Sequence, residues 1–210
     1  MDNTQIKKSQ NNTEKRETYR YLLGRYKRAV ANEFYFEALI IVYAMLEDRM
    51  KSFLYYCGYF ANRNQLRLYT KTRNDILATF WSDSKGSKAP SFMNISTKID
   101  FSRNMLEWAE TVEEKDITGK EYLIALKKLI ENLDVDGMIE TLENLRGEQG
   151  WLRYRNEIIH ASLNKNIDAL YEGLGDKVES GMEYARFIDS QVKLLKKSNF
   201  VRRKMKMQNN

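Results

Sequence analysis

The sequence predicts an all-α protein, an up-and-down helical bundle of four to five long helices with short extra helices. Three observations support this fold class. One proline and ten glycines in 210 residues are too few turn residues for an all-β sandwich or barrel. Apolar residues recur at helical spacing along most of the chain. The hydrophobic share of 42% is typical of a protein with a buried core rather than of a disordered one.

The first half of the chain predicts two long helices, over residues 14–31 and 33–56. Apolar residues of the second one point in nearly every direction of its helical wheel, which is typical of a central helix packed on several sides. A loop then leads to a short helix over residues 73–81. Residues 83–96, which contain the only proline, form the clearest surface loop.

The second half predicts further helices over residues 97–114, 135–146, 151–163 and 176–204. Thr118 and Glu121 have the spacing of a capping box, which predicts another helix from there to Leu133. Length favours a single domain over residues 1–210. Within it, residues 1–13 form a polar N-terminal extension and residues 191–210 a basic helix end or tail.

The positive charge is concentrated in that C-terminal segment. The chain carries 35 basic and 29 acidic residues, a net charge of +6, and residues 191–210 contribute seven basic and no acidic ones. The rest of the chain is therefore close to neutral. The segment is either a solvated helix end or a phosphate-binding arm. In the second case the expected RNA contacts are Lys196, Lys197, Arg202, Arg203 and Lys204.

Single residues exclude whole classes of chemistry. Cys57 is the only cysteine, so one chain forms neither an internal disulfide nor a thiolate zinc site. His160 is the only histidine, which excludes a multi-histidine metal site within one subunit. The sequence also lacks a Gly-rich phosphate loop. We therefore expect no metal and no cofactor.

The sequence also predicts a cytoplasmic protein without a membrane partner. The longest apolar run, Ala38–Leu46, has nine residues, whereas a membrane span needs roughly 20. The first thirty residues are polar and charged and contain no apolar signal-peptide core.

The segment Trp151–His160 is the strongest candidate for chemistry. On a helical wheel, Arg155 lies in the middle of an apolar arc, within about 60° of its four apolar neighbours, which are Trp151, Leu152, Ile158 and Ile159. A guanidinium there is costly unless it is paired or faces a partner surface. Asn156 and His160 lie one turn apart on the adjoining edge. An arginine beside an Asn–His pair suits phosphate chemistry, because arginine neutralises a phosphorane and histidine moves a proton near neutral pH.

Both key residues also have an ordinary structural interpretation. His160 could be a helix-face histidine bonded to a neighbour. Arg155 could form a buried ion pair with Glu47 or Asp48, which interrupt the apolar 33–56 helix. The same pair could equally orient a catalytic arginine, so Glu47, Asp48 and the nearby Arg153 are included as supporting residues of the site.

Arg155-x4-His160, with Asn156 directly after the arginine, resembles the R-x4–6-H motif of HEPN domains. The order of elements is also similar, with long helices first, the motif on a late helix and one closing helix. The resemblance implies a dimeric, metal-independent endoribonuclease, of the kind found among bacterial toxins and antiphage effectors. It implies Arg155 and His160 as catalytic residues and Asn156 as a residue that orients the phosphate or the histidine.

The resemblance also implies RNA as substrate, a homodimer and a possible antitoxin or other regulatory protein. HEPN toxins neutralised by a nucleotidyltransferase commonly carry a modifiable tyrosine two residues after the histidine, where this chain has Ser162. Two other functions remain open. One is a catalytically inactive HEPN-like scaffold that binds a protein, a nucleotide or RNA. The other is a helical interaction protein whose basic tail contacts nucleic acid or an anionic membrane.

Overall fold

The computed structural model describes residues 12–62, 66–81, 90–161 and 171–207. The predicted all-α class is confirmed, since the only β-pairing among these residues is a single bridge between Phe60 and Leu68. No helix in the described ranges is long and apolar enough to cross a membrane. The elements are α1 (Asn12–Ala31), α2 (Tyr35–Tyr56), α3 (Thr70–Phe80), α4 (Ile95–Thr111), the 3-10 helix η2 (Glu114–Ile117), α5 (Glu121–Ile130), α6 (Val135–Arg146), α7 (Trp151–Ala161), α9 (Leu174–Ser198) and α10 (Phe200–Lys204).

Helix α2 forms the centre of the molecule, as its all-round apolar pattern predicts. Twelve of its 22 residues are buried, and α1, α4 and α9 all pack against it. It forms an antiparallel hairpin with α1, in which Arg25 pairs with Glu37 and Tyr19 contacts Asp48. Burial of apolar surface from several sides is the main force that holds such a helix in place.

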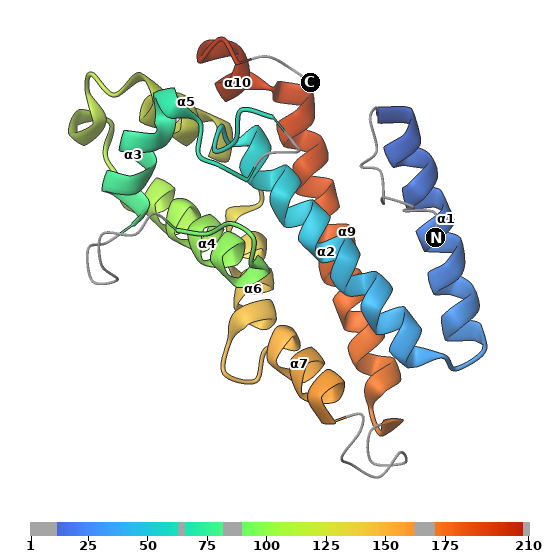
Figure 1. Ribbon diagram of the computed structural model, residues 1–210. Coiled ribbons are helices and arrows are strands. Elements are labelled where there is room, and N and C mark those ends of the chain that lie inside the picture. Colours follow the sequence, from blue (N-terminus) through green and yellow to red (C-terminus); the bar gives the residue numbers. More distant parts are fainter. Residues whose placement is uncertain (1–11, 63–65, 82–89, 162–170, 208–210) are drawn as a thin grey trace, which may run out of the picture.

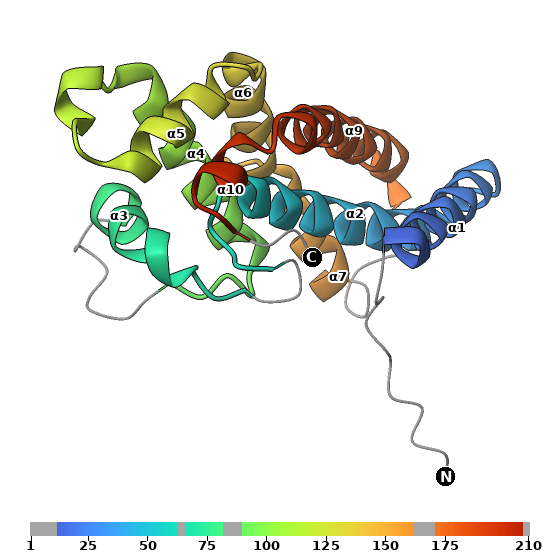
Figure 2. The same ribbon diagram turned by 90° about the horizontal axis from the view of Figure 1, so that it is seen from above.

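Helices α2 and α9 run side by side in the same direction (Figure 1). The contacts between them stay in register along the pair: Tyr35 lies against Gly175 near one end, and Arg49 bonds Asp189 further along. A parallel pair needs a long connection to bring the chain back to its starting end. Helices α3 to α7 supply that connection, and α3 to α6 gather on one side of α2, opposite α1 (Figure 2).

Helix α7, which carries the candidate motif, is fixed to α9 at its first residue. The indole of Trp151 is buried, and its Nε1 donates a hydrogen bond to the carbonyl of Lys177 over 2.6 Å. The ring lies directly over Gly181, where an added Cβ would come within 2.4 Å of Nε1. A glycine at this position therefore permits the close approach that sets the angle between the two helices.

The closing helix is shorter than predicted, because the chain breaks at Asn199. This residue adopts a left-handed conformation with φ 45°, and the following α10 folds back toward the end of α2. The predicted helix over 176–204 is thus two helices. The break brings Arg202 into the core, which the basic pattern of the segment does not predict.

Arg202 is fully buried and is not available to RNA, which corrects its assignment as a phosphate contact. Its guanidinium stacks on the ring of Tyr55 with the carbon Cζ 3.7 Å from the centroid. The two terminal nitrogens donate to the carbonyl oxygens of Tyr55, Phe60 and Ala61 at 3.3, 2.9 and 2.9 Å. Arg202 therefore satisfies the carbonyl groups at the end of α2 and in the loop that follows it.

The capping box predicted at Thr118 is wrong. Helix α5 begins at Glu121 after Lys120, and no side chain caps it. The hydroxyl of Thr118 instead donates to the carbonyl oxygen of Lys115 in the 3-10 helix η2. A local side-chain bond to the preceding turn thus replaces the capping bond that the sequence pattern predicts.

Replacement of Arg202 by alanine is expected to destabilise the protein by about 2–4 kcal/mol, because it leaves several buried carbonyl groups without a donor. Urea denaturation measures this loss. Arg203→Ala is the matched control, since Arg203 is exposed and its loss should cost less than about 0.5 kcal/mol. Equal stabilities of the two variants would contradict the role assigned to Arg202.

Candidate functional site

Helix α7 holds Asn156 and His160 on its exposed side and Arg155 on the side that faces α2. Arg155 is half-buried, whereas Asn156 and His160 are exposed. Trp151, Leu152 and Ile158 take up the buried side of the helix. Arg155 therefore lies between buried neighbours on this side of the helix, as the helical wheel predicts, and its guanidinium reaches the boundary between α7 and α2.

Arg155 is held by an aromatic ring rather than by a carboxylate. Its guanidinium carbon lies 4.0 Å from the ring centroid of Tyr43 on α2. Its Nη1 donates to the Oδ1 of Asn156 over 2.9 Å. Its buried Nε has no hydrogen-bond partner in the part of the chain that the structure describes. The stacked geometry fixes the plane of the guanidinium, and its Nη2 has no hydrogen-bond partner among the described residues.

Burial raises the pKa of the Tyr43 hydroxyl above its usual range, Glu47 raises it further, and Arg155 lowers it. Tyr43 is therefore a neutral phenol at physiological pH and adds no negative charge that would compete with a phosphate for Arg155. The site at the α2–α7 boundary thus carries a guanidinium without a salt bridge to any described residue.

His160 lies in the last turn of α7, about one and a half turns after Arg155. It makes no hydrogen bond or ion pair with another described residue. Both motif residues thus lie on one helix, and the exposed imidazole forms no hydrogen bond with Arg155. Ser162, where a modifiable tyrosine is common in HEPN toxins, lies outside the described residues.

The supporting residues form ion pairs with residues other than Arg155. Arg153 forms an exposed pair with Glu157 one turn along α7, at 3.0 Å. Glu47 accepts a bond of 3.1 Å from the Nζ of Lys98, a side chain that is fully buried. Neither contact involves Arg155, so the predicted ion pair between Arg155 and Glu47 is absent from the described contacts.

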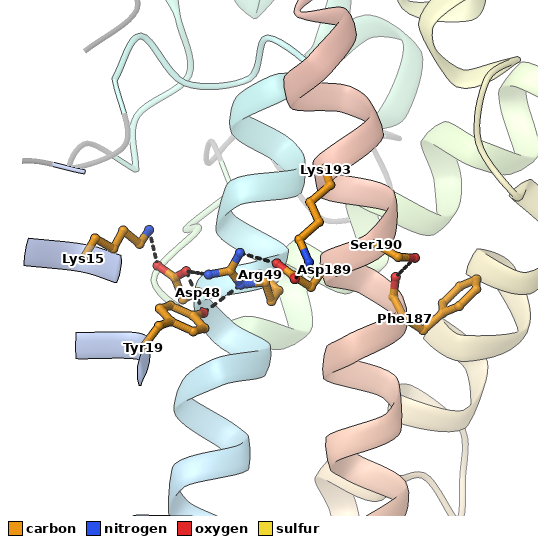
Figure 3. Close-up of polar contacts among 8 residues, drawn as sticks. All are labelled: Lys15, Tyr19, Asp48, Arg49, Phe187, Asp189, Ser190 and Lys193. Atoms are coloured by element: carbon orange, nitrogen blue, oxygen red, sulfur yellow. Dashed lines mark hydrogen bonds and ion pairs between the residues drawn. The ribbon is translucent and has the colours of Figure 1, made fainter. Parts of the chain in front are cut away.

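Asp48 belongs to a separate network that joins α1, α2 and α9 (Figure 3). It contacts Lys15 at 2.6 Å and accepts a 2.9 Å hydrogen bond from the hydroxyl of Tyr19. It also contacts the neighbouring Arg49 at 3.1 Å, and Arg49 in turn bonds Asp189 of α9 at 2.5 Å. The network replaces the predicted role of Asp48 beside Arg155 and ties the three long helices together.

The electrostatic interactions in this network favour the ionised form of the Asp48 carboxyl. Burial alone would raise the pKa of the Asp48 carboxyl, but Lys15, Arg49 and the Tyr19 hydroxyl outweigh it and lower that pKa below its ordinary value. Burial raises the pKa of Tyr19 far above its usual range, and Asp48 adds to the rise. Tyr19 is thus a neutral donor, and Asp48 is ionised at neutral pH.

The predicted basic arm divides into different environments. Lys196 is exposed and lines a groove between α1, α2 and α9, and Lys197 is exposed. Arg203 donates to the carbonyl of Ser198, and Lys204 lies 3.5 Å from Glu121. With Arg202 buried, the segment is not a continuous cationic surface.

Sequence reasoning missed four residues that define these sites, namely Tyr19, Tyr43, Arg49 and Asp189. The charged triplet at residues 47–49 in an apolar helix was the available signal, since buried charges need partners on neighbouring elements. Nothing in the sequence indicates which tyrosine would stack on Arg155.

Other chemistry has no visible centre in the described ranges. No three His, Cys, Asp or Glu side chains there lie close enough together to hold a metal ion. Cys57 is fully buried, and burial raises the pKa of its thiol, so it is not an activated nucleophile. Comparisons of the chain with protein families, with curated proteins and with solved structures find no match.

Replacement of Asp48 by asparagine is expected to cost about 1–3 kcal/mol at neutral pH, because it leaves Lys15 and Arg49 short of a negative partner. The sign of the pH effect follows from the lowered pKa. The stabilisation is complete above the ordinary value of 3.8 and is lost as the pH falls through the lower value of the folded protein. The difference between wild type and Asp48→Asn should therefore shrink at acidic pH.

Urea denaturation between about pH 2 and 7 measures this difference, with Glu17→Gln as the control for the loss of an exposed α1 carboxylate. A difference that grows as the pH falls would contradict the assignment.

Proposed function

We propose that this chain is a metal-independent endoribonuclease of HEPN-like fold, with Arg155 and His160 as its catalytic residues. The observation that carries the proposal is the environment of Arg155. Its guanidinium is oriented by Tyr43, lies beside Asn156 and has no carboxylate partner among the described residues. A half-buried arginine in this state is available to a phosphate oxygen, and the only histidine of the chain follows on the same helix.

The proposed reaction is an internal transfer at phosphorus. A ribose 2′-oxygen loses its proton to a general base and forms a bond to the adjacent phosphorus. The bond from phosphorus to the 5′-oxygen breaks, and that oxygen takes a proton from a general acid. The products are a 2′,3′-cyclic phosphate and a 5′-hydroxyl. Arg155 stabilises the charge on the phosphorane oxygens, and Asn156 orients the phosphate or the imidazole.

Two proton transfers favour a dimeric site. One chain supplies one imidazole, which serves as base or acid, and the His160 of a second copy would supply the other. The surface next to Arg155 suits such a contact. Ile40 lies one turn before Tyr43 on the same face of α2 and is 45% exposed. An exposed isoleucine beside the proposed site is consistent with a self-association surface.

The HEPN resemblance further supports a role as a toxin or antiphage-defence effector acting on cellular RNA, with an antitoxin or other protein as regulator. A second function, an inactive HEPN-like scaffold that binds a protein, a nucleotide or RNA, is favoured by a different observation. The Nη1 of Arg155 is already bonded to Asn156, and His160 forms no hydrogen bond with another described residue.

The first test is cleavage of total RNA by the purified protein in excess EDTA. The wild type should cleave and leave 2′,3′-cyclic phosphate ends. His160→Ala should reduce the rate by about 10²–10⁴-fold, the usual contribution of one general acid–base group. Arg73→Ala, which changes an exposed arginine of α3 outside the site, serves as the matched control and should retain activity.

Equal cleavage by wild type and His160→Ala would contradict the assignment of the site. Complete loss of cleavage on addition of EDTA would contradict the metal-independent mechanism. RNA binding without cleavage in the wild type would favour the scaffold.

The dimer makes a separate prediction. Ile40→Asp should shift the protein toward the monomer and lower its specific activity, because a carboxylate would have to be desolvated in the interface. Light scattering measures the mass. Leu194→Asp is the matched control, since Leu194 is also 45% exposed but lies on α9. A wild-type protein that stays monomeric at high concentration would contradict the dimeric site.

A further inference from the structure

A cationic groove lies between α1, α2 and α9, away from the α7 motif. Its volume is about 530 Å³, within the range of sites that hold small ligands or a few nucleotides of a polymer. Five basic residues line it, which are Lys15, Arg16, Arg49, Lys193 and Lys196, against a single carboxylate, Asp189. No residue of α7 takes part, so the groove is distinct from the Arg155 site.

The groove keeps an excess of positive charge after its internal pairs are counted. Lys15 and Arg49 contact Asp48, while Arg49 and Lys193 contact Asp189. Three cations thus share two carboxylates.

Arg16 and Lys196 are exposed, on opposite sides of the groove, and form no ion pair with another described residue. They raise the excess to about three charges, which would attract an anion strongly in a concave site.

The network also fixes the shape of the groove. The guanidinium of Arg49, whose side chain is 15% exposed, is held by Tyr19, Asp48 and Asp189, which belong to three different helices. Both walls are therefore tied to the floor (Figure 3). A ligand would meet a largely preformed site, which lowers the entropy cost of binding.

We propose that this groove binds the phosphodiester backbone of RNA, and the inference rests on the proposed ribonuclease function. Its edges combine ammonium, guanidinium and hydroxyl donors, with Thr13 and Ser52 supplying the hydroxyls. Proteins use these same groups to hold phosphate oxygens without reading sequence. Tyr19, Tyr56 and Val192 add an apolar part to the lining, but the excess of cations favours a polyanion over an uncharged protein surface.

The groove lies within reach of the proposed catalytic site. Arg49 follows Tyr43, the residue that stacks on Arg155, by six positions on α2, which is about 9 Å along the helix axis and about 120° around it. A single RNA strand that curves around α2 can span this separation. RNA in the groove contributes affinity and position, while the chemistry takes place at α7. Loss of the groove charges therefore weakens RNA binding even in a protein that cannot cleave.

The test measures binding of a fluorescent 20-nucleotide single-stranded RNA in EDTA, with all proteins carrying His160→Ala to prevent cleavage. Arg16→Glu/Lys196→Glu should weaken binding by at least about tenfold and flatten the slope of log K against log salt by about 1.4, or about 0.7 for each lost phosphate contact. Lys71→Glu/Arg73→Glu is the matched control, with the same change of net charge at two exposed residues of α3. It should change the affinity much less.

Arg16→Gln/Lys196→Gln provides a milder variant, and thermal unfolding shows that each protein is folded. Equal weakening by the groove and α3 variants would overturn the inference, because net charge alone would then explain it. Competition by poly-glutamate as effective as by RNA would also overturn it and would point to an acidic protein partner.

The outcomes separate this inference from the proposed function. Loss of RNA binding in the groove variants, combined with a wild type that does not cleave, would support the groove and contradict the nuclease. Cleavage by the wild type with unchanged binding in the groove variants would support the nuclease and overturn the groove.

Discussion

The structure depends on the burial of α2 on nearly all sides. A helix that is apolar all round cannot lie at a surface, so the other elements must surround it. Helices α1 and α9 cover one side of it, and α4 with its neighbours covers another. The few charges of α2 then have to be satisfied in place. Glu47 forms an ion pair with the buried Lys98. Asp48 pairs with Lys15 of α1, and Arg49 pairs with Asp189 of α9.

This constraint explains which parts of the fold the sequence predicts well. For helices with a clear apolar stripe or an all-round apolar pattern, the predicted ends lie within a few residues of the observed ones, because burial of the apolar surface fixes the position of the helix. The errors lie where one local group has two possible partners. Thr118 bonds back into η2 rather than capping α5. The basic helix breaks at Asn199, and this break allows Arg202 to reach the end of α2.

At the candidate site, too, the sequence pattern predicts that a residue is buried but not which residue it contacts. The helical wheel of residues 151–160 correctly marks Arg155 as a charge beside apolar neighbours that must face another element. It cannot identify that element, because a guanidinium is stabilised by a carboxylate or by an aromatic face. Tyr43 takes this role and leaves the charge of Arg155 uncompensated by any described carboxylate. In the basic segment, charge alone treated Lys196 and Arg202 alike, although one is exposed and the other is fully buried.

The contacts of Arg202 also have a consequence for the order in which the protein folds. The carbonyl groups that it satisfies belong to residues 147, 142 and 141 positions earlier in the chain. During synthesis, the end of α2 and the loop after it emerge long before their donor is made. These hydrogen bonds can therefore form only after residue 202 has left the ribosome, and α2 exposes apolar surface until α9 has been made to cover it. Contacts over such sequence separations are formed slowly, so this chain is expected to depend on protection against aggregation while it is being made.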